Sequence, residues 1–167
     1  MGQLTHRPNA VQRALHVITR TQTGSWLFAR LLHHLDRPVL RLSHGRFSLT
    51  SALAGLPVVA VTTIGAKSGQ PRTLPLVAIP DGENVILIAS NFGQQQHPAW
   101  YYNLRAHPET RLTYEGKTVT YLAQETDGVE RERCWQCAVT LYSGYRRYQE
   151  RAGQRKIGVF LLKPQTK

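Results

Sequence analysis

Residues 62–72 form a short connection whose side chains are suited to holding an anion. The connection joins two β-branched runs and contains two glycines, two cations and several hydroxyl groups. Glycine lets the backbone approach an anion closely, successive N–H groups can surround it, and Lys67 and Arg72 supply positive charge. A P-loop is excluded because its glycine–lysine spacing is absent and a strand follows. The connection fits a phosphate site, and taken alone it fits a solvated basic hairpin loop equally well.

Tyr142, Tyr145 and Tyr148 form a second group with possible chemistry. Their three-residue spacing places them on one side of a helical turn. Buried tyrosines usually belong to the core and keep one polar end near water, so a packing stripe is one interpretation. One wall of a concave binding pocket is the other.

The remaining reactive side chains are not arranged for catalysis. Cys134 and Cys137 have the CxxC spacing, but no second pair and no thioredoxin-like unit accompanies them. We expect two small core residues, with a redox role left open. His33 and His34 are neighbours on a predicted helix and point about 100° apart, so we predict no metal site. The acidic residues are scattered, which does not favour hydrolysis.

The elements that position these residues fall into two regimes. Residues 10–48 have a helical pattern of leucines, and from residue 56 the pattern is that of strands. The expected strands are residues 56–63, 73–79, 84–89, 111–114, 118–124 and 157–162. Helices are expected at residues 98–105 and 128–142, and a helical turn should carry Tyr145 and Tyr148. Short connections and one inserted helix favour a six-stranded barrel over βαβ units, so the fold class is α+β, mainly β.

The N-terminal region is expected to be a unit of its own. Residues 1–50 contain seven arginines and one acidic residue, Asp36, and precede a barrel domain at residues 51–167. This basic helical segment fits a lid, a helix packed on the core, or an amphipathic helix on an anionic membrane surface. No stretch has the roughly 20 apolar residues of a membrane span, and no signal-peptide core is present. We expect a cytoplasmic protein, with a peripheral place at the inner membrane face left open.

Four segments, taken in order, resemble the deazaflavin-dependent nitroreductase family, also described as deazaflavin-dependent quinone reductases. They are Thr-Thr-x-Gly-x-Lys-Ser-Gly-x-x-Arg in residues 62–72, Ala-Ser at 89–90, His-Pro-Ala-Trp-Tyr-x-Asn-Leu-x-Ala-x-Pro in 97–108, and Tyr-x-x-Tyr-x-x-Tyr in 142–148. The resemblance covers residues 56–164. It implies a split β-barrel of six strands that binds coenzyme F-420, an 8-hydroxy-5-deazaflavin with a phosphodiester and an acidic tail. It also implies hydride transfer to a quinone, nitroaromatic or similar electron-poor acceptor.

The resemblance also implies roles for individual residues. The residues that it places at the cofactor are Thr63, Lys67, Ser68, Arg72, Pro75, Ser90, Asn91 and Trp100. Lys67, Ser68 and Arg72 would hold the phosphate and tail, Ser90 and Asn91 would lie beside the ring, and Trp100 would support the pocket wall. The three tyrosines would face the substrate, with Tyr145 as proton donor and Ser90 or Tyr142 delivering or relaying the proton.

Three positions depart from the family pattern and leave alternatives open. Ala66 stands where members commonly have Arg, Asn91 where many have Lys, and Ser143 where many have Pro. FMN is therefore the alternative cofactor for a barrel of this type. The net charge of +11 also allows a non-catalytic module that binds an anionic ligand, lipid or nucleic acid. No nucleic-acid motif is present, so we expect a small-molecule electron acceptor as partner, and a monomer or a homodimer.

Overall fold

The computed structural model describes residues 56–165. Seven strands lie within them: β1 (Val58–Ile64), β2 (Pro71–Val77), β3 (Ile79–Asp81), β4 (Asn84–Ile88), β5 (Glu109–Tyr114), β6 (Lys117–Glu125) and β7 (Val159–Pro164). The helices are α4 (Ala99–Ala106), α5 (Gly128–Leu141) and α6 (Gly144–Arg151), with a 3-10 turn η1 (Asn91–Gly93). The predicted basic helical segment at residues 1–50, and its role as lid, core or membrane element, lie outside the described residues.

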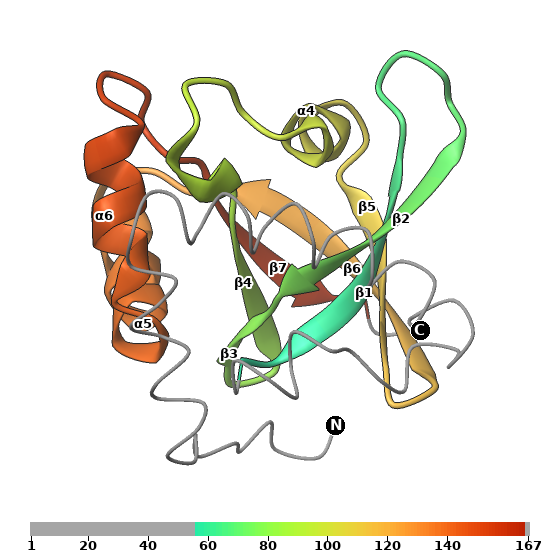
Figure 1. Ribbon diagram of the computed structural model, residues 1–167. Helices are drawn as coiled ribbons and strands as arrows, with labels where there is room; N and C mark the ends of the chain where they lie inside the picture. Colours follow the sequence, from blue (N-terminus) through green and yellow to red (C-terminus); the bar gives the residue numbers. More distant parts are fainter. Residues whose placement is uncertain (1–55, 166–167) are drawn as a thin grey trace.

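The described strands form one antiparallel sheet in the order β2-β1-β5-β6-β7-β4-β3. The sheet curls so far that its two edge strands, β2 and β3, are consecutive parts of the same stretch of chain (Figure 1). This mainly β, curled architecture confirms a fold of the split-barrel type.

The prediction of six strands is wrong by one. The apolar run at residues 73–79 was expected to be a single strand, but its two ends pair with different partners. Val77 is the last residue paired with β1, and Ile79 is the first paired with β4. Between them, the amide of Ala78 donates to the carbonyl oxygen of Pro57 at 2.8 Å. The change of partner, rather than any turn residue, divides the run into β2 and β3.

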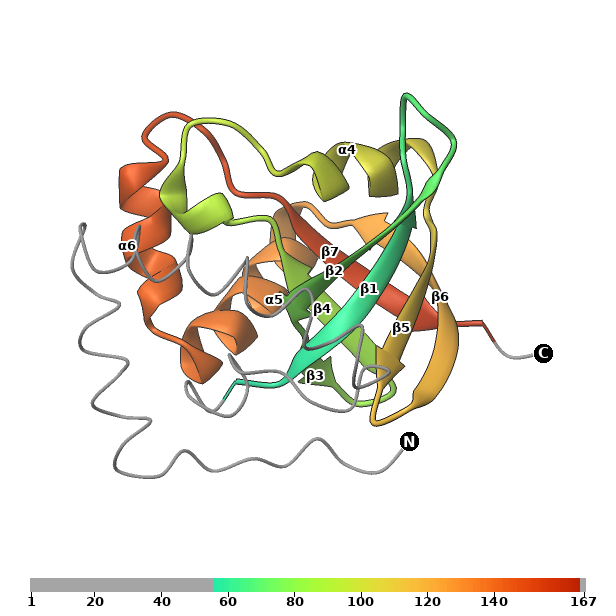
Figure 2. The same ribbon diagram turned by 45° about the vertical axis from the view of Figure 1, so that its right-hand side comes forward.

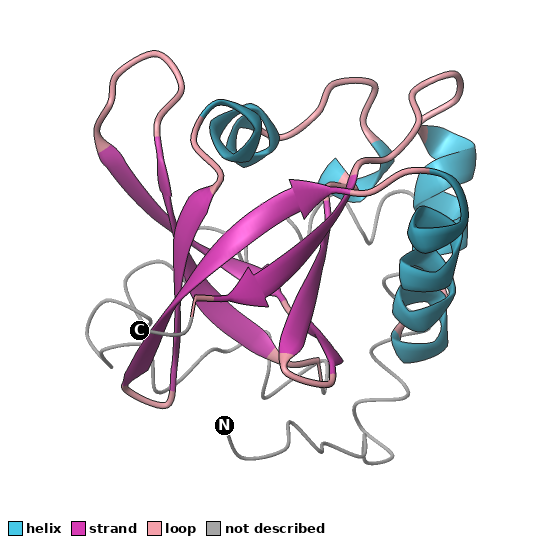
Figure 3. Ribbon diagram, turned by 180° about the vertical axis from the view of Figure 1, so that it is seen from behind, coloured by secondary structure: helices cyan, strands magenta, loops and turns pink. Residues whose placement is uncertain are grey.

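The core consists of two clusters on opposite faces of the curled sheet. Successive strand residues point to opposite faces, so β4 and β7 contribute to both. Ile86 and Leu161 pack in the cluster with α5 and α6, whereas Leu87 and Phe160 pack in the cluster with α4. Figures 2 and 3 show α5 and α6 against the outside of the curled sheet and α4 over one end of its inside. Burial on both faces explains the unbroken apolar run of β4.

Candidate functional site

The loop between β1 and β2, residues 65–70, has a compact backbone. The amide of Gly65 donates to the carbonyl oxygen of Gln70 at 2.9 Å, and the amide of Gly69 donates to the carbonyl oxygen of Gly65 at 2.8 Å. Gly69 has φ = +64°, a left-handed conformation that glycine adopts without steric cost. The loop extends beyond the end of the barrel (Figure 1). Its main chain is therefore fixed while its outer surface faces solvent.

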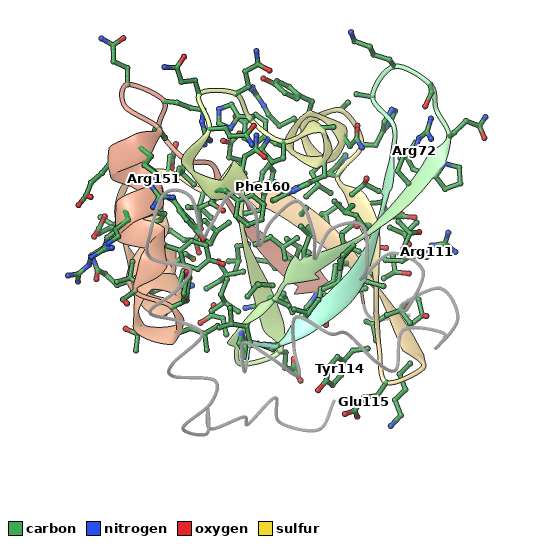
Figure 4. The ribbon with its side chains drawn as sticks, viewed as in Figure 1. Arg72, Arg111, Tyr114, Glu115, Arg151 and Phe160 are labelled. Carbon is green, nitrogen blue, oxygen red and sulfur yellow. The ribbon has the colours of Figure 1, made fainter. Side chains whose placement is uncertain are left out.

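The two cations of the loop region are available for a ligand. Lys67 and Arg72 are exposed, and neither forms an ion pair within residues 56–165. Arg72 lies at the base of the loop (Figure 4) and pairs directly with Thr63, so both side chains leave the sheet on the face that α4 covers. Ser68 is exposed, and its hydroxyl accepts the amide of the loop's last residue at 3.3 Å. Pro75 is three positions beyond Arg72 and lies on the opposite face.

Asn103 joins this loop to α4, a role that the sequence did not reveal. Its Oδ1 accepts the amide of Ala66 at 3.0 Å, and its Nδ2 donates to the hydroxyl of Thr63 at 3.0 Å. Asn103 is 9% exposed and Thr63 is fully buried. The sequence carried one signal of this role: Asn103 is the only side-chain amide on the otherwise aromatic and apolar buried face of α4. Asn103 fixes the start of the cationic loop against that helix.

Ser90 and Asn91 follow β4 in a tightly folded segment. Asn91 and Phe92 have φ values of 46° and 53°, a left-handed conformation that is uncommon outside glycine. The side-chain amide of Asn91 donates to the carbonyl oxygen of Gln96 at 2.9 Å and to Oε1 of Gln94 at 3.3 Å. Asn91 therefore shapes its own segment, and Ser90 is half-buried next to it.

The three tyrosines form one buried cluster with Trp135. Their ring centroids lie 5.5 Å apart for Tyr142 and Tyr145, and 6.1 Å apart for each of the other two pairs. The Tyr145 ring lies 6.2 Å from Trp135. All three tyrosines are less than 10% exposed and belong to the core cluster that includes α5 and α6. The packing-stripe interpretation describes this arrangement, and it does not exclude contact with a ligand at the cluster's edge.

Burial also sets the protonation of these tyrosines. It raises the pKa of Tyr145 and of Tyr148 well above the ordinary value of 10.0, and the neighbouring Tyr142 adds to both shifts. The hydroxyl oxygens of Tyr142 and Tyr148 are 3.4 Å apart. Within the described residues, the hydroxyl of Tyr145 makes no hydrogen bond. Tyr145 and Tyr148 therefore carry their protons at neutral pH.

Packing between η1 and α6 brings the Ser90 segment to the tyrosine cluster. The Phe92 ring lies edge-on to Tyr148 with centroids 6.0 Å apart. A Cβ atom at Gly93 would lie 2.8 Å from the carbonyl oxygen of Tyr148, so only glycine allows this approach. Trp100 lies elsewhere, on the buried face of α4, with its ring 6.0 Å from Phe160. Along one end of the barrel the order is therefore cationic loop, α4, η1 and α6 (Figures 1 and 2).

The sequence as a whole matches a known protein family. Residues 38–164 match the F420H(2)-dependent quinone reductases. The chain belongs to this family. An F420H(2)-dependent quinone reductase of Mycobacterium tuberculosis is 30% identical over 141 residues, covering 79% of this chain and 94% of that protein. A second protein of that organism is 32% identical over 109 residues, covering 65% and 91%.

Solved structures agree with this assignment. An F420-H2 dependent reductase, FDR-A, is 37% identical with a TM-score of 0.59, covering 64% of this chain and 94% of its own. A structure described as a domain-swapped dimer is 34% identical with a TM-score of 0.61, covering 77% and 95%. The chain is thus an oxidoreductase of the deazaflavin-dependent quinone reductase type.

The described residues fit the coenzyme of this family. A phosphodiester and an acidic tail need cations that are not already paired, and the exposed Lys67 and Arg72 at the β1–β2 loop provide two. Ala66, where members commonly have arginine, contributes only its amide, which Asn103 already binds. Among residues 56–165, no group of three or more His, Cys, Asp or Glu could hold a metal ion. No helix in that part of the chain is long and apolar enough to cross a membrane.

Proposed function

We propose that this chain reduces a quinone with reduced coenzyme F-420, using the β1–β2 loop for the coenzyme tail and the η1–α6 end for the acceptor. One observation carries the proposal: two unpaired cations, one on the β1–β2 loop and one at its base, lie where Asn103 fixes that loop to α4, in a chain of this family. Lys67 and Arg72 bind the phosphate and acidic tail. Ser68 and Thr63 support them from the same loop and strand.

The acceptor end supplies protons. When bound, the deazaflavin supplies a hydride, and a quinone that takes up a hydride must also gain a proton on oxygen. Tyr145 keeps its proton at neutral pH and has a hydroxyl that no described residue binds, so we assign it as the proton donor. Tyr142 and Tyr148, joined through their hydroxyls, line the acceptor side. Ser90 and Asn91 hold the deazaflavin ring between the β1–β2 loop and the tyrosine cluster.

Two finer features belong to the same proposal. Nitroaromatic compounds are a second acceptor class, because a flat, electron-poor molecule fits the same aromatic surroundings. A homodimer is proposed because one relative is described as a domain-swapped dimer. Membership of an F420H(2)-dependent family favours the deazaflavin over FMN, the alternative cofactor.

Fluorescence titration with coenzyme F-420 tests the proposal directly. Lys67→Ala combined with Arg72→Ala removes two charge-assisted contacts, each worth about 1.5–3 kcal/mol, so the Kd should rise roughly 100-fold or more. Lys117→Ala combined with Lys163→Ala, on β6 and β7, makes the same change of charge on strands that do not pair with β1 or β2, and it should leave the Kd within about threefold. No binding by the wild-type protein, or equal losses in both double variants, would refute the proposal.

A further inference from the structure

Arg155, in the connection between α6 and β7, binds the segment that carries Ser90. Its guanidinium donates to three carbonyl oxygens: Nη2 to Ser90 at 2.7 Å, Nε to Gln94 at 2.8 Å, and Nη1 to Ala89 at 3.1 Å. Nη1 also lies 3.3 Å from Nδ1 of His97. These partners precede Arg155 by 58 to 66 positions in the sequence. One side chain therefore contacts both ends of residues 89–97.

The backbone of Arg155 is itself fixed to α6. Nε2 of Gln149 donates to the carbonyl oxygen of Arg155 at 2.9 Å, and Oε1 of Gln149 accepts the amide of Ile157 at 3.0 Å. The amide of Arg155 donates to the carbonyl oxygen of Ala152 at 3.1 Å. Burial holds the pKa of Arg155 below its ordinary value, and no carboxylate pairs with it within residues 56–165. This arginine is placed for carbonyl groups rather than for an ion pair.

The segment that Arg155 binds needs such support. Left-handed conformations at non-glycine residues cost about 1–3 kcal/mol each, and two occur in succession at Asn91 and Phe92. Asparagine tolerates this conformation, whereas phenylalanine does so rarely. The pairing of β4 ends at Ile88 and cannot enforce it. The contacts of Arg155 with Ser90 and Gln94 lie immediately before and after the strained pair.

We propose that Arg155 is a positioning residue of the reductase: it holds residues 89–97, so that the segment carrying Ser90 stays packed against Tyr148 during hydride and proton transfer. The proposal rests on the proposed function for the role of Ser90. Core formation does not account for the strain, because Phe92, one of the two strained residues, is 44% exposed and belongs to neither core cluster. Strained backbone held by contacts outside the core is typical of sites that are organised in advance for a ligand.

Hydrogen exchange in the cofactor-free protein tests the contact without any activity. The amides of Gly93 and Gln94 donate to the carbonyl oxygens of Ser90 and Asn91, so they report on the segment. Arg155→Lys keeps the charge but not the fork of donors. It should speed exchange at these two amides about tenfold or more, while amides of β4 and β7 stay unchanged. Arg146→Lys, exposed on α6, is the matched control and should change neither.

Steady-state kinetics with menadione and reduced coenzyme F-420 test the positioning role. A misplaced Ser90 should lower kcat by about 10- to 100-fold in Arg155→Lys, while the Kd for the coenzyme rises less than about threefold because the loop cations remain. Unchanged exchange at Gly93 and Gln94, or equal acceleration at all amides, overturns the proposal, as does local acceleration with an unchanged kcat. Failure of the wild-type protein to bind the coenzyme overturns the proposed function instead, and the exchange result then tests the contact alone.

Discussion

Replacing Asn103 with alanine should destabilise the protein by an amount that its two hydrogen bonds define. The Thr63 hydroxyl is fully buried, and losing its partner should cost about 1–3 kcal/mol. Ala66 is exposed, so its amide can turn to water, and that loss should be about 0.5–1.5 kcal/mol. The free energy of unfolding should therefore fall by about 1.5–4.5 kcal/mol, which leaves a typical domain folded.

Urea unfolding of a double-mutant cycle with Thr63→Val measures this. Valine removes the hydroxyl, so the second substitution at Asn103 leaves no buried polar group unpaired. The double variant should be more stable than the sum of the two single losses by about 1 kcal/mol, at an unchanged m-value. Strict additivity, or a loss below about 0.5 kcal/mol in Asn103→Ala, would contradict the assigned contacts. The Kd for coenzyme F-420 should rise in Asn103→Ala, because the β1–β2 loop loses its attachment to α4.

Three further outcomes follow from single contacts. A Cβ atom at Gly144 would overlap the Tyr142 ring, so Gly144→Ala should lower the free energy of unfolding by about 1–3 kcal/mol and reduce kcat with menadione. The pKa of His97 is lowered mainly by burial and further by the charge of Arg155, so the folded state binds fewer protons than the unfolded state. The free energy of unfolding in urea should therefore fall as the pH drops below about 6.5. The fall should be smaller in His97→Asn. The pKa of Asp81 is lowered by hydrogen bonds from an arginine of α5, so its contribution should be present above about pH 3.9 and lost in acid-unfolding curves below it.

The sequence predicted the strands well where side-chain pattern alone decides them. Residues 84–89 and 118–124 contain apolar or β-branched residues with clear turns beside them, and both are strands. The run at residues 73–79 has the same character from end to end, yet it contains two strands. What divides it is pairing with β1 on one side and β4 on the other, and no local pattern encodes that choice.

The cationic loop was found from composition, but the residues that fix it were not. Glycines, lysine and arginine close together are a local signal. Asn103 binds a residue 37 positions away, and Arg155 binds residues about sixty positions away, so neither contact leaves a mark in the neighbouring sequence. Arg155 stands in a polar stretch after α6 where an exposed cation is the ordinary expectation. The family resemblance also gave it no role.

The tyrosine cluster shows a different limit. Spacing placed Tyr142, Tyr145 and Tyr148 on one side of a turn, and the structure has them together. Spacing cannot say whether that side meets core, ligand or both. The approach of Gly93 to Tyr148 depends on the fold around η1, and it decides what lies next to the cluster.

The position of β7 has a consequence for biosynthesis. This last strand lies between β6 and β4, and without it the sheet separates into β2-β1-β5-β6 and β4-β3. A nascent chain whose β7 has not yet emerged from the ribosome therefore has two unfinished sheets, each with an open edge. The barrel can close only after β7, which follows the other six strands in the described chain, has emerged. Until then the β7 of another, already completed copy can fill the same place, so slow emergence of this strand should favour exchanged pairs over single barrels.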